Sequence, residues 1–269
     1  MTSSLHTTFS GSIPEYYDRY LGPAWFGPFG RELAALLPPD PGGDVLEIAC
    51  GTGLVTRELR ERLAPSRRLV ASDLNKPMLD YARSKLGDRA IEWREADAQA
   101  LPFRDGEFAA AACALGFMFM PDKPKAFSEA RRVLMDGGTL ILSVWDRAEE
   151  NDAARIYAET IEAMFPGDEE MRFRLPWSMH DQGALRKLLG DARFDVVRME
   201  KKRLSVGDVD ARTIATGQVR GTPRGLLLEK KGVPMDEAIE RVANAIAKYL
   251  ASPGARLHGQ AILVEARAA

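Results

Sequence analysis

The feature that most limits the possible folds is a regular alternation of short apolar runs and helical periodicity between residues 43 and 146. Five apolar runs are predicted to be strands: 45–49, 68–73, 91–93, 108–115 and 139–145. Strands that alternate with helices of about 10–15 residues imply right-handed crossovers and a parallel sheet. The chain is therefore predicted to be an α/β protein with a doubly wound sheet.

The remaining segments extend this sheet and add helices to it. Alternating residues at 194–206 and an apolar run at 261–265 predict two more strands, for seven in all, mostly parallel. We expect three parts. These are an N-terminal lid segment (1–42), a ligand-binding core (43–146), and a variable substrate cap with the closing strands of the same domain (147–269).

Composition excludes several functional classes. Among the 269 residues, 37 Lys and Arg face 39 Asp and Glu, a formal charge of −2, so no global basic field favours nucleic acid or an anionic membrane. The two cysteines, Cys50 and Cys113, are too few for a disulfide framework or a zinc cluster. The polar start has no apolar h-region, and the longest apolar run, 108–120, is too short to span a bilayer. We expect a cytoplasmic protein without membrane partners.

A glycine turn follows the first strand, and an acidic residue follows the second. Gly51 and Gly53 allow a tight turn and a close approach of a ligand to the backbone, and the next helix begins there with free N–H groups. Asp73 lies 20 residues after Gly53, where a carboxylate accepts hydrogen bonds from ribose hydroxyls. The pattern predicts a ligand that contains adenosine, bound at the carboxyl edge of the sheet.

Two residues distinguish between candidate ligands. The dinucleotide fingerprint requires Gly or Ala three residues after the second glycine, where this chain has Thr56. Glu47 lies at the strand end, where it would repel a pyrophosphate and attract an ammonium group. S-adenosylmethionine has a ribose, a cationic amino-acid end and no phosphate, and it fits better than NAD.

Several motifs in order resemble one enzyme family. Residues 47–53 (EIACGTG), 72–75 (SDLN), 96–103 (ADAQALPF) and 127–140 (FSEARRVLMDGGTL) are similar to the motifs of class I S-adenosylmethionine-dependent methyltransferases. The similarity is to the ubiquinone/menaquinone-biosynthesis-like branch (methyltransferase types 11 and 25), and residues 11–21 resemble the lid entry of a bacterial group within it. The resemblance implies a Rossmann-like fold, S-adenosylmethionine as cofactor and methyl transfer as the reaction.

The resemblance also implies roles for individual residues. Glu47, Ala49, Gly51 and Gly53 belong to the motif that holds the methionine end, and Asp73 would bind the ribose. The remaining implied cofactor-binding positions are Leu74 and Met78 beside the adenine, Asp97 and Ala98 at its amino group, Leu115 and Gly116 on the methyl side, and Tyr17 and Tyr20 in the lid.

The segment 114–122 departs from the resembling branch, because it is apolar where relatives often carry glutamines. This departure predicts a more apolar substrate pocket. No general base stands out, and the candidates are His180 and Tyr17. None of the three histidines has a metal-ligand partner three or four residues away, so no metal site is expected.

The leading hypothesis is in-line transfer of a methyl group to an oxygen, nitrogen or carbon of a small, partly apolar molecule. A non-catalytic cofactor-binding regulator or partner subunit is the alternative from another class. A nucleic-acid methyltransferase is disfavoured, because residues 114–117 read Ala-Leu-Gly-Phe and not Asn/Asp-Pro-Pro-aromatic, and a nicotinamide dehydrogenase is disfavoured by Thr56. The substrate, the methylated atom and the oligomeric state, with a homodimer as one option, are left open.

Overall fold

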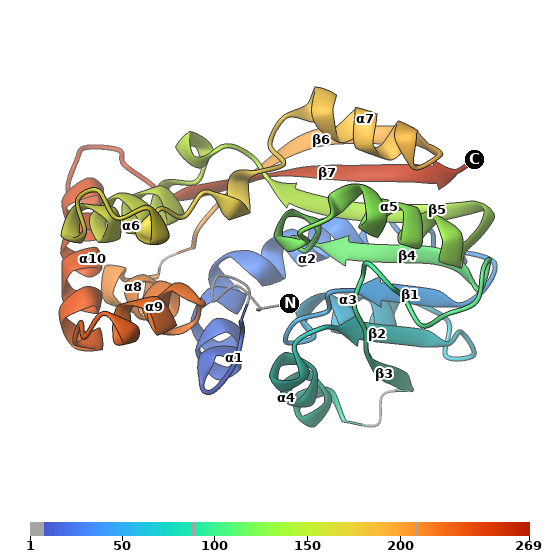
Figure 1. The fold of residues 1–269 in the computed structure, drawn as a ribbon, viewed down its shortest axis with the longest axis horizontal. Coiled ribbons are helices and arrows are strands. Elements are labelled where there is room, and N and C mark those ends of the chain that lie inside the picture. The colour runs from blue at the N-terminus through green and yellow to red at the C-terminus, as the bar shows by residue number, and fades with distance from the viewer. Residues whose placement is uncertain (1–7, 88–89, 208) are drawn as a thin grey trace.

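The computed structural model describes residues 8–87, 90–207 and 209–269, which form a seven-stranded sheet with helices on both faces and a helical cap at one end (Figure 1). The strand order is β3-β2-β1-β4-β5-β7-β6. Strand β7 runs antiparallel to both of its neighbours, β5 and β6, and the other adjacent strands pair in parallel. The strands are β1 (Val45–Ile48), β2 (Leu69–Asp73), β3 (Ile91–Glu95), β4 (Phe108–Ala114), β5 (Leu134–Trp145), β6 (Phe194–Ser205) and β7 (His258–Ala268). The predicted fold class, a mostly parallel sheet of seven strands, is confirmed.

The two faces of the sheet are covered by different helices because alternate strand residues point to opposite sides. On one face, side chains such as Val45 and Ala110 pack with α2 (Gly27–Ala34) and α3 (Leu54–Arg62), and α4 (Lys76–Leu86) packs on Ala71. On the other face, Leu46 and Ala111 share a core with α5 (Lys123–Val133) and α7 (Gln182–Asp191). This arrangement makes the sheet doubly wound.

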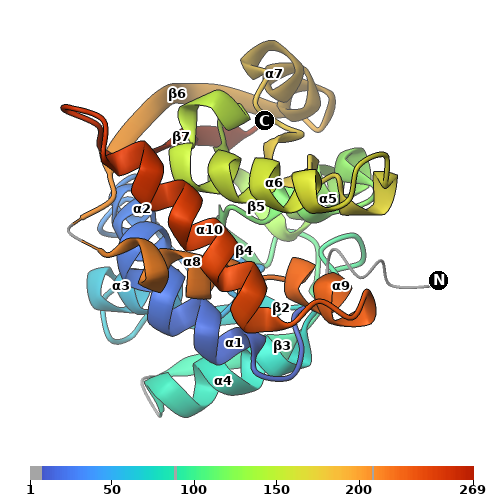
Figure 2. The ribbon, with the colours of Figure 1, turned by 90° about the vertical axis from the view of Figure 1, so that its left-hand side faces the viewer.

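A helical cap lies beyond the carboxyl ends of the parallel strands (Figures 1 and 2). It combines lid helices from the N-terminal segment with cap helices from the C-terminal part of the chain. The lid helices are α1 (Ile13–Tyr16) and η2 (Tyr17–Phe26), and the cap helices are α6 (Asp152–Met164), α8 (Ala211–Arg220), α9 (Arg224–Lys230) and α10 (Met235–Leu250). Helix α10 crosses the outer side of this group and contacts α6 and α8, while α8 contacts η2 (Figure 2). The short helices are η3 (Phe117–Phe119), η4 (Ala148–Glu150), η5 (Glu169–Met171) and η6 (Leu175–Trp177). Segments from both ends of the chain therefore enclose the site edge of the sheet.

The segment η2 is a π-helix, which the sequence did not predict. It contains Pro23, which has no N–H to donate, and it ends where the Gly27 N–H donates to the Gly22 carbonyl five residues earlier. Helical stretches of this kind are rare and often lie at functional sites. Here the wide helix carries Tyr17 at its start and Phe26 at its end.

The polar residues that precede α5 and α4 have different roles at the start of their helices. Asp122 caps α5 through a hydrogen bond from the Lys125 N–H, as expected for a capping aspartate. Asn75 precedes α4 but makes no side-chain cap, because its Oδ1 accepts a hydrogen bond from the Phe9 N–H. Asn75 therefore does not cap α4, and its side chain ties the N-terminal segment to this edge of the sheet.

Candidate functional site

The glycine turn between β1 and α3 has the backbone conformation that its sequence predicts. Gly51 and Gly53 have φ of 54° and 76°, in the left-handed region that favours glycine. A Cβ on Gly53 would lie 2.9 Å from Leu86 Cδ1 and 3.1 Å from Ala82 Cβ, both in α4. Gly53 therefore serves both the turn and the packing of α4 beside it.

Two non-glycine residues with positive φ end the neighbouring strands β1 and β4. Ala49 has φ of 57° and Leu115 has φ of 52°. Such residues carry strain that surrounding structure must hold in place, and they cluster at functional sites. Gly116 completes the group, because a Cβ there would lie 2.8 Å from Ala49 Cβ. The fold thus brings three predicted site residues together at adjacent strand ends.

Asp73 lies at the end of β2, buried, with its carboxylate held by the backbone. Its Oδ2 accepts a hydrogen bond from the Gly51 N–H at 2.8 Å, and its Oδ1 accepts one from the Asn75 N–H at 2.7 Å. Burial raises the pKa of Asp73, and these hydrogen bonds oppose the rise. The acidic residue and the glycine turn, predicted separately, are directly connected.

Glu47, in β1, is 1% exposed, and its Oε2 has no hydrogen-bond partner among the described residues. Burial raises the pKa of Glu47 to about 8, Thr56 acts in the opposite direction, and the charge of Asp73 adds to the rise. Among the described residues, no Lys or Arg is a main contributor to the pKa of either carboxyl. Two buried carboxylates without a basic partner suit a ligand that brings its own positive charge, and S-adenosylmethionine carries an ammonium and a sulfonium.

The residues predicted to surround the adenine lie at the next strand ends. Leu74 is 59% exposed directly after β2, whereas Met78 is buried within α4. Asp97, after β3, is half-buried, and its Oδ1 accepts hydrogen bonds from the N–H and Nε2 of Gln99. Ala98, beside it, is half-buried against the core. The exposed Leu74 and the carboxylate of Asp97 are compatible with binding of a flat adenine ring. The roles of the individual residues toward the adenine stay predictions.

The two lid tyrosines have different surroundings. Tyr17 stacks on Phe26 with ring centroids 4.3 Å apart, and it lines two cavities at the strand ends. Tyr20 stacks on Tyr16 at 5.7 Å and packs against Gly217 of α8, and it lines neither cavity. The structure therefore brings Tyr17, and not Tyr20, to the other candidate cofactor-binding residues.

The first cavity, of about 40 Å³, lies between the glycine turn and the lid. Its walls include Tyr17, Glu47, Ala49, Gly51 and Leu115, which are five of the predicted cofactor-binding residues. These five residues thus converge on one cavity from β1, β4 and the lid, and the other predicted cofactor-binding residues do not line it.

The second cavity, of about 130 Å³, adjoins the first and shares Tyr17, Phe26 and Leu115 with it. Half of its other lining residues are aromatic: Phe9, Trp25, Phe119, Trp145, Tyr157, Phe173 and Trp177. A cavity of this size holds about one six-membered ring. The predicted apolar pocket is present, and most of its aromatic walls come from the lid and cap.

Arg224, at the start of α9, is a residue that the sequence gave no reason to select. It is fully buried, with its guanidinium 5.4 Å from the ring centroids of both Tyr157 and Phe173. It donates a hydrogen bond to the Met171 carbonyl and lies 3.6 Å from Glu162. Cation–π contacts of this geometry hold both rings in the cavity wall from behind. Only its tertiary contacts distinguish Arg224 from a surface arginine.

His180, one of the two candidates for a general base, is exposed. Its Nδ1 is 2.7 Å from the Trp177 carbonyl oxygen, and it lines neither cavity. The structure does not bring this candidate to the site. The pKa of Tyr17, the other candidate, is raised by burial and by the charges of Asp73 and Asp18, so its hydroxyl stays protonated.

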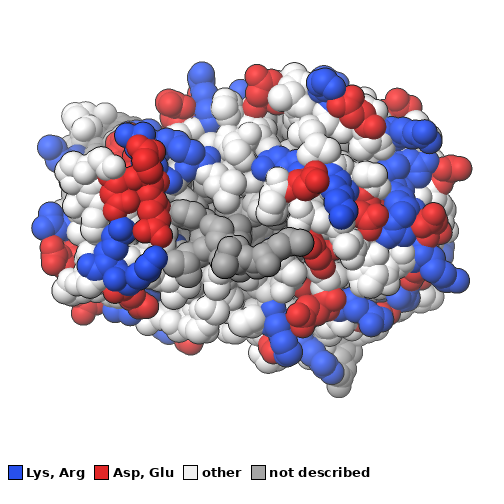
Figure 3. Space-filling model, in the orientation of Figure 1, with Lys and Arg blue, Asp and Glu red and all other residues white. Residues whose placement is uncertain are grey.

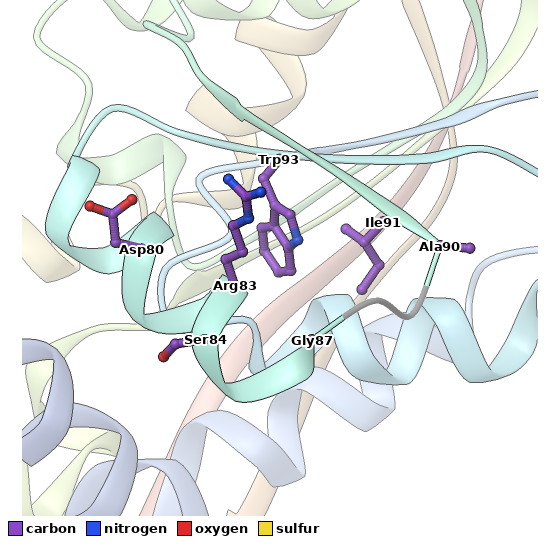
Figure 4. A pocket seen from close by; sticks show the side chains of 7 residues that line it. All are labelled: Asp80, Arg83, Ser84, Gly87, Ala90, Ile91 and Trp93. Atoms are coloured by element: carbon purple, nitrogen blue, oxygen red, sulfur yellow. The ribbon is translucent and has the colours of Figure 1, made fainter.

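A separate hollow lies away from this edge, between α4 and β3 (Figure 4). Arg83 and Trp93 point toward one another across it, and Asp80 and Ser84 stand on its helical side (Figure 4). It shares no residue with either cavity.

Within the described ranges, no group of three or more His, Cys, Asp or Glu has a metal-binding arrangement, and no helix is long and apolar enough to cross a membrane.

The chain is similar to known methyltransferases. Residues 46–142 match the family model of a methyltransferase domain. A demethylmenaquinone methyltransferase of Thermus thermophilus is 46% identical over 100 residues, which cover 36% of this chain and 45% of that protein. A ubiquinone/menaquinone biosynthesis C-methyltransferase of Pseudomonas aeruginosa is 32% identical over 170 residues, 58% of this chain and 66% of that protein. The matched region spans about half to two thirds of these curated relatives.

A solved structure extends the similarity of fold to the whole chain. A S-adenosylmethionine-dependent methyltransferase from Thermotoga maritima superposes with a TM-score of 0.55 at 18% identity, covering 96% of this chain and 97% of that chain. At this identity the likeness concerns the fold alone. With the glycine turn, Asp73 and Glu47 at the edge of that fold, residues 46–142 form a methyltransferase domain of the class I S-adenosylmethionine-dependent type.

Proposed function

We propose that this protein transfers a methyl group from S-adenosylmethionine to a small, ring-bearing, largely apolar molecule. The observation that carries the proposal is the adjacency of the two cavities, which share Tyr17, Phe26 and Leu115. One cavity is lined by the predicted methionine-end residues and the other by aromatic rings. A substrate ring in the second cavity would therefore lie beside the reactive end of the cofactor.

The residues of this chain would act mainly by alignment and exclusion of water. S-adenosylmethionine supplies an activated methyl group on a sulfonium. Asp73 and Glu47 would compensate the positive charge and hold the cofactor in place, and the aromatic walls would exclude water from the reacting ends. These contributions suffice for an in-line displacement when the substrate atom is already a good nucleophile.

The ionisable residues that line the aromatic cavity favour a substrate nucleophile that needs no basic side chain. Tyr17 and Tyr157 are the ionisable residues in the described wall of the aromatic cavity, and burial raises the pKa of both. An electron-rich ring carbon attacks before it loses its proton, so it makes the smallest demand on a base. The relatives are named for methylation in menaquinone and ubiquinone biosynthesis. We therefore propose a quinone-type ring carbon as the acceptor.

The surface supports a small molecule over nucleic acid. Acidic and basic side chains are interspersed over the face that Figure 3 shows, with no broad basic area. Binding to a duplex requires clustered Lys and Arg. The formal charge of −2 also disfavours binding to nucleic acid.

The experiment has two stages. Calorimetric titration with S-adenosylhomocysteine, with NAD in parallel, tests the cofactor, and micromolar binding of the former alone is expected. Incubation with S-adenosylmethionine and benzene-1,4-diol, a single-ring hydroquinone, followed by mass spectrometry, then tests transfer to a ring carbon. Binding without transfer to any ring compound would favour the non-catalytic regulator, and a preference for NAD would contradict the proposal.

A further inference from the structure

Gln218, in α8, is a polar residue in the wall of the aromatic cavity. It is 5% exposed, and its Oε1 is buried with no hydrogen-bond partner in the described part of the chain. An unpartnered buried acceptor is costly, and native proteins contain few of them. A ligand that brings a donor into the cavity would remove this cost.

The neighbouring hydroxyl groups cannot supply that donor. Thr222 Oγ1 donates to the Gln218 backbone carbonyl at 2.7 Å, which uses its single proton. Tyr157 Oη and Thr222 Oγ1 are 3.4 Å apart, so Tyr157 must be the donor of that pair. Both hydroxyl protons at this corner of the cavity are therefore committed within the cap, while the Gln218 oxygen is left as an acceptor.

Asn151, on another side of the same cavity, is also occupied. Its Nδ2 lies within hydrogen-bond distance of the carbonyl oxygens of Asp146, Arg147 and Gln260, and its Oδ1 accepts from the Gln260 N–H. This side chain joins α6 to β7, and both its nitrogen and its oxygen already have partners within the protein. Gln218 thus differs from the other amide of the cavity wall.

The backbone around Gln218 is closely held. Gly217 packs on the lid, where a Cβ would lie 2.8 Å from both Tyr20 Cβ and Leu21 Cδ2. Three residues beyond Gln218, a Cβ on Gly221 would lie 2.9 Å from the Tyr17 amide nitrogen. These contacts fix α8 against the lid, so the position of Gln218 relative to the cavity is set by packing on both sides of it.

We propose that Gln218 is the specificity-determining residue of this cavity, and that its Oε1 accepts a hydrogen bond from a hydroxyl or N–H group on the substrate ring. The inference rests on the proposed function only in assigning this cavity to the substrate. The hydrogen bond to Gln218 favours ring compounds that carry a hydroxyl or N–H group at the end facing α8. The same compounds with that group methylated should bind less tightly. Sites that hydrogen-bond a hydroxyl in this way reject analogues that lack it.

The test compares 4-ethylphenol with 4-ethylanisole, in which a methyl group replaces the hydrogen of the phenolic donor. Three of the four tryptophans, Trp25, Trp145 and Trp177, line the cavity, and the fourth, Trp93, lies at the separate hollow of Figure 4. In a Trp93→Phe background, tryptophan fluorescence therefore reports on the cavity. Each probe is titrated with S-adenosylhomocysteine present, using excitation at the red edge of tryptophan absorption to avoid the probes.

The informative variant is Gln218→Met, which keeps a similar side-chain length and removes the amide. The control is Thr216→Val, which removes a polar group from the same helix where its hydroxyl donates to the Arg212 carbonyl, away from the cavity. We expect the parent to bind the phenol about five- to tenfold more tightly than the ether. Gln218→Met should abolish that preference by weakening phenol binding, and Thr216→Val should retain it.

Equal affinity of the parent for both probes, or a phenol preference that survives in Gln218→Met, would overturn the proposal. A preference for the ether that disappears in Gln218→Met would also overturn it, because the amide would then act as a donor. Calorimetry with S-adenosylhomocysteine shows whether each variant is folded. It also separates the two proposals, since a protein that binds the phenol through Gln218 but not S-adenosylhomocysteine would refute the methyltransferase function alone.

Discussion

Gly221, at the end of α8, approaches the backbone of Tyr17 so closely that a Cβ on Gly221 would lie 2.9 Å from the Tyr17 amide nitrogen and 3.0 Å from its α-carbon. Tyr17 lines both cavities. The cap and the lid therefore meet at the residue that separates the predicted cofactor from the aromatic cavity. This contact couples the packing of α8 to the geometry of the site.

The first prediction concerns this contact. Gly221→Ala should lower the free energy of unfolding by about 1–3 kcal/mol, because the new Cβ meets rigid backbone at Tyr17 and lies 2.5 Å from the Gly217 carbonyl oxygen. It should also weaken S-adenosylhomocysteine binding, since Tyr17 must move. Denaturant unfolding and calorimetry measure the two effects. The control is Gly190→Ala in α7, where a Cβ meets nothing within 4 Å, and which should be neutral or slightly stabilising.

Asp73→Asn should weaken S-adenosylhomocysteine binding at least about 100-fold. The carboxylate accepts hydrogen bonds from Gly51 and Asn75, and each hydrogen bond to a charged group contributes about 1.5–3 kcal/mol. An amide in its place would also lack the negative charge that we propose accepts hydrogen bonds from the ribose. Asp80→Asn, at an exposed carboxylate paired with Lys76 in α4, is the matched control and should bind normally. Near-normal affinity in Asp73→Asn would show that the ribose lies elsewhere.

Glu47 makes the stability of the unliganded protein depend on pH. Its pKa is about 8 in the folded protein, above the ordinary value of 4.5, so the folded state favours the protonated form. The stability from this group is fully present below about pH 4.5 and is lost as the pH rises through about 8. Glu47→Gln should therefore raise the melting temperature relative to the parent near pH 8, with little difference near pH 4.5. Thermal melts across this range measure the effect.

The same change should weaken the cofactor complex, because the neutral amide cannot balance a positive charge. Parent affinity for S-adenosylhomocysteine should increase as the pH rises toward 8, and the Glu47→Gln variant should lose this part of the pH dependence. A variant that is less stable at pH 8 and binds with the parent's pH profile would show that Glu47 is ionised and compensated within the protein.

Tyr17 should act through its ring and not through its hydroxyl. Its pKa is raised by burial and by nearby carboxylates, so it stays neutral across the working range. Tyr17→Phe should lose at most about 0.5–1.5 kcal/mol of cofactor affinity and keep its pH–rate profile, because the ring still stacks on Phe26. Tyr17→Ala should lose more than about tenfold in affinity, since water would enter between the cavities. Loss of turnover in Tyr17→Phe with intact S-adenosylhomocysteine binding would instead make the hydroxyl catalytic.

The core of the fold was predictable because its determinants are local. The strands β1, β2 and β4 are mainly apolar runs, and the turn at Gly51 and Gly53 needs a backbone that only glycine adopts readily. Asp73 was predictable for a related reason, since parallel strands end at one edge and their following residues must meet there.

The cap was predicted only as helical segments. Its helices pack through contacts between distant parts of the chain, such as Gly221 with Tyr17 and Arg224 with Tyr157. No local pattern identified Arg224 as buried, because an arginine near a proline is usually a surface residue. Similarly, nothing near Asn75 showed that its side chain would bind the Phe9 N–H in place of capping α4.

Local sequence patterns were therefore enough to predict the sheet, the glycine turn and the carboxylates at the carboxyl edge of the sheet. Periodicity and backbone conformation are properties of short segments, so they can be read without the rest of the chain. Contacts between distant segments, in contrast, place Tyr17 and not Tyr20 at the cavities and His180 outside them, and they leave the Gln218 oxygen without a partner among the described residues. These features depend on which side chains of the lid and cap meet after folding, and that is set by packing between segments up to about two hundred residues apart.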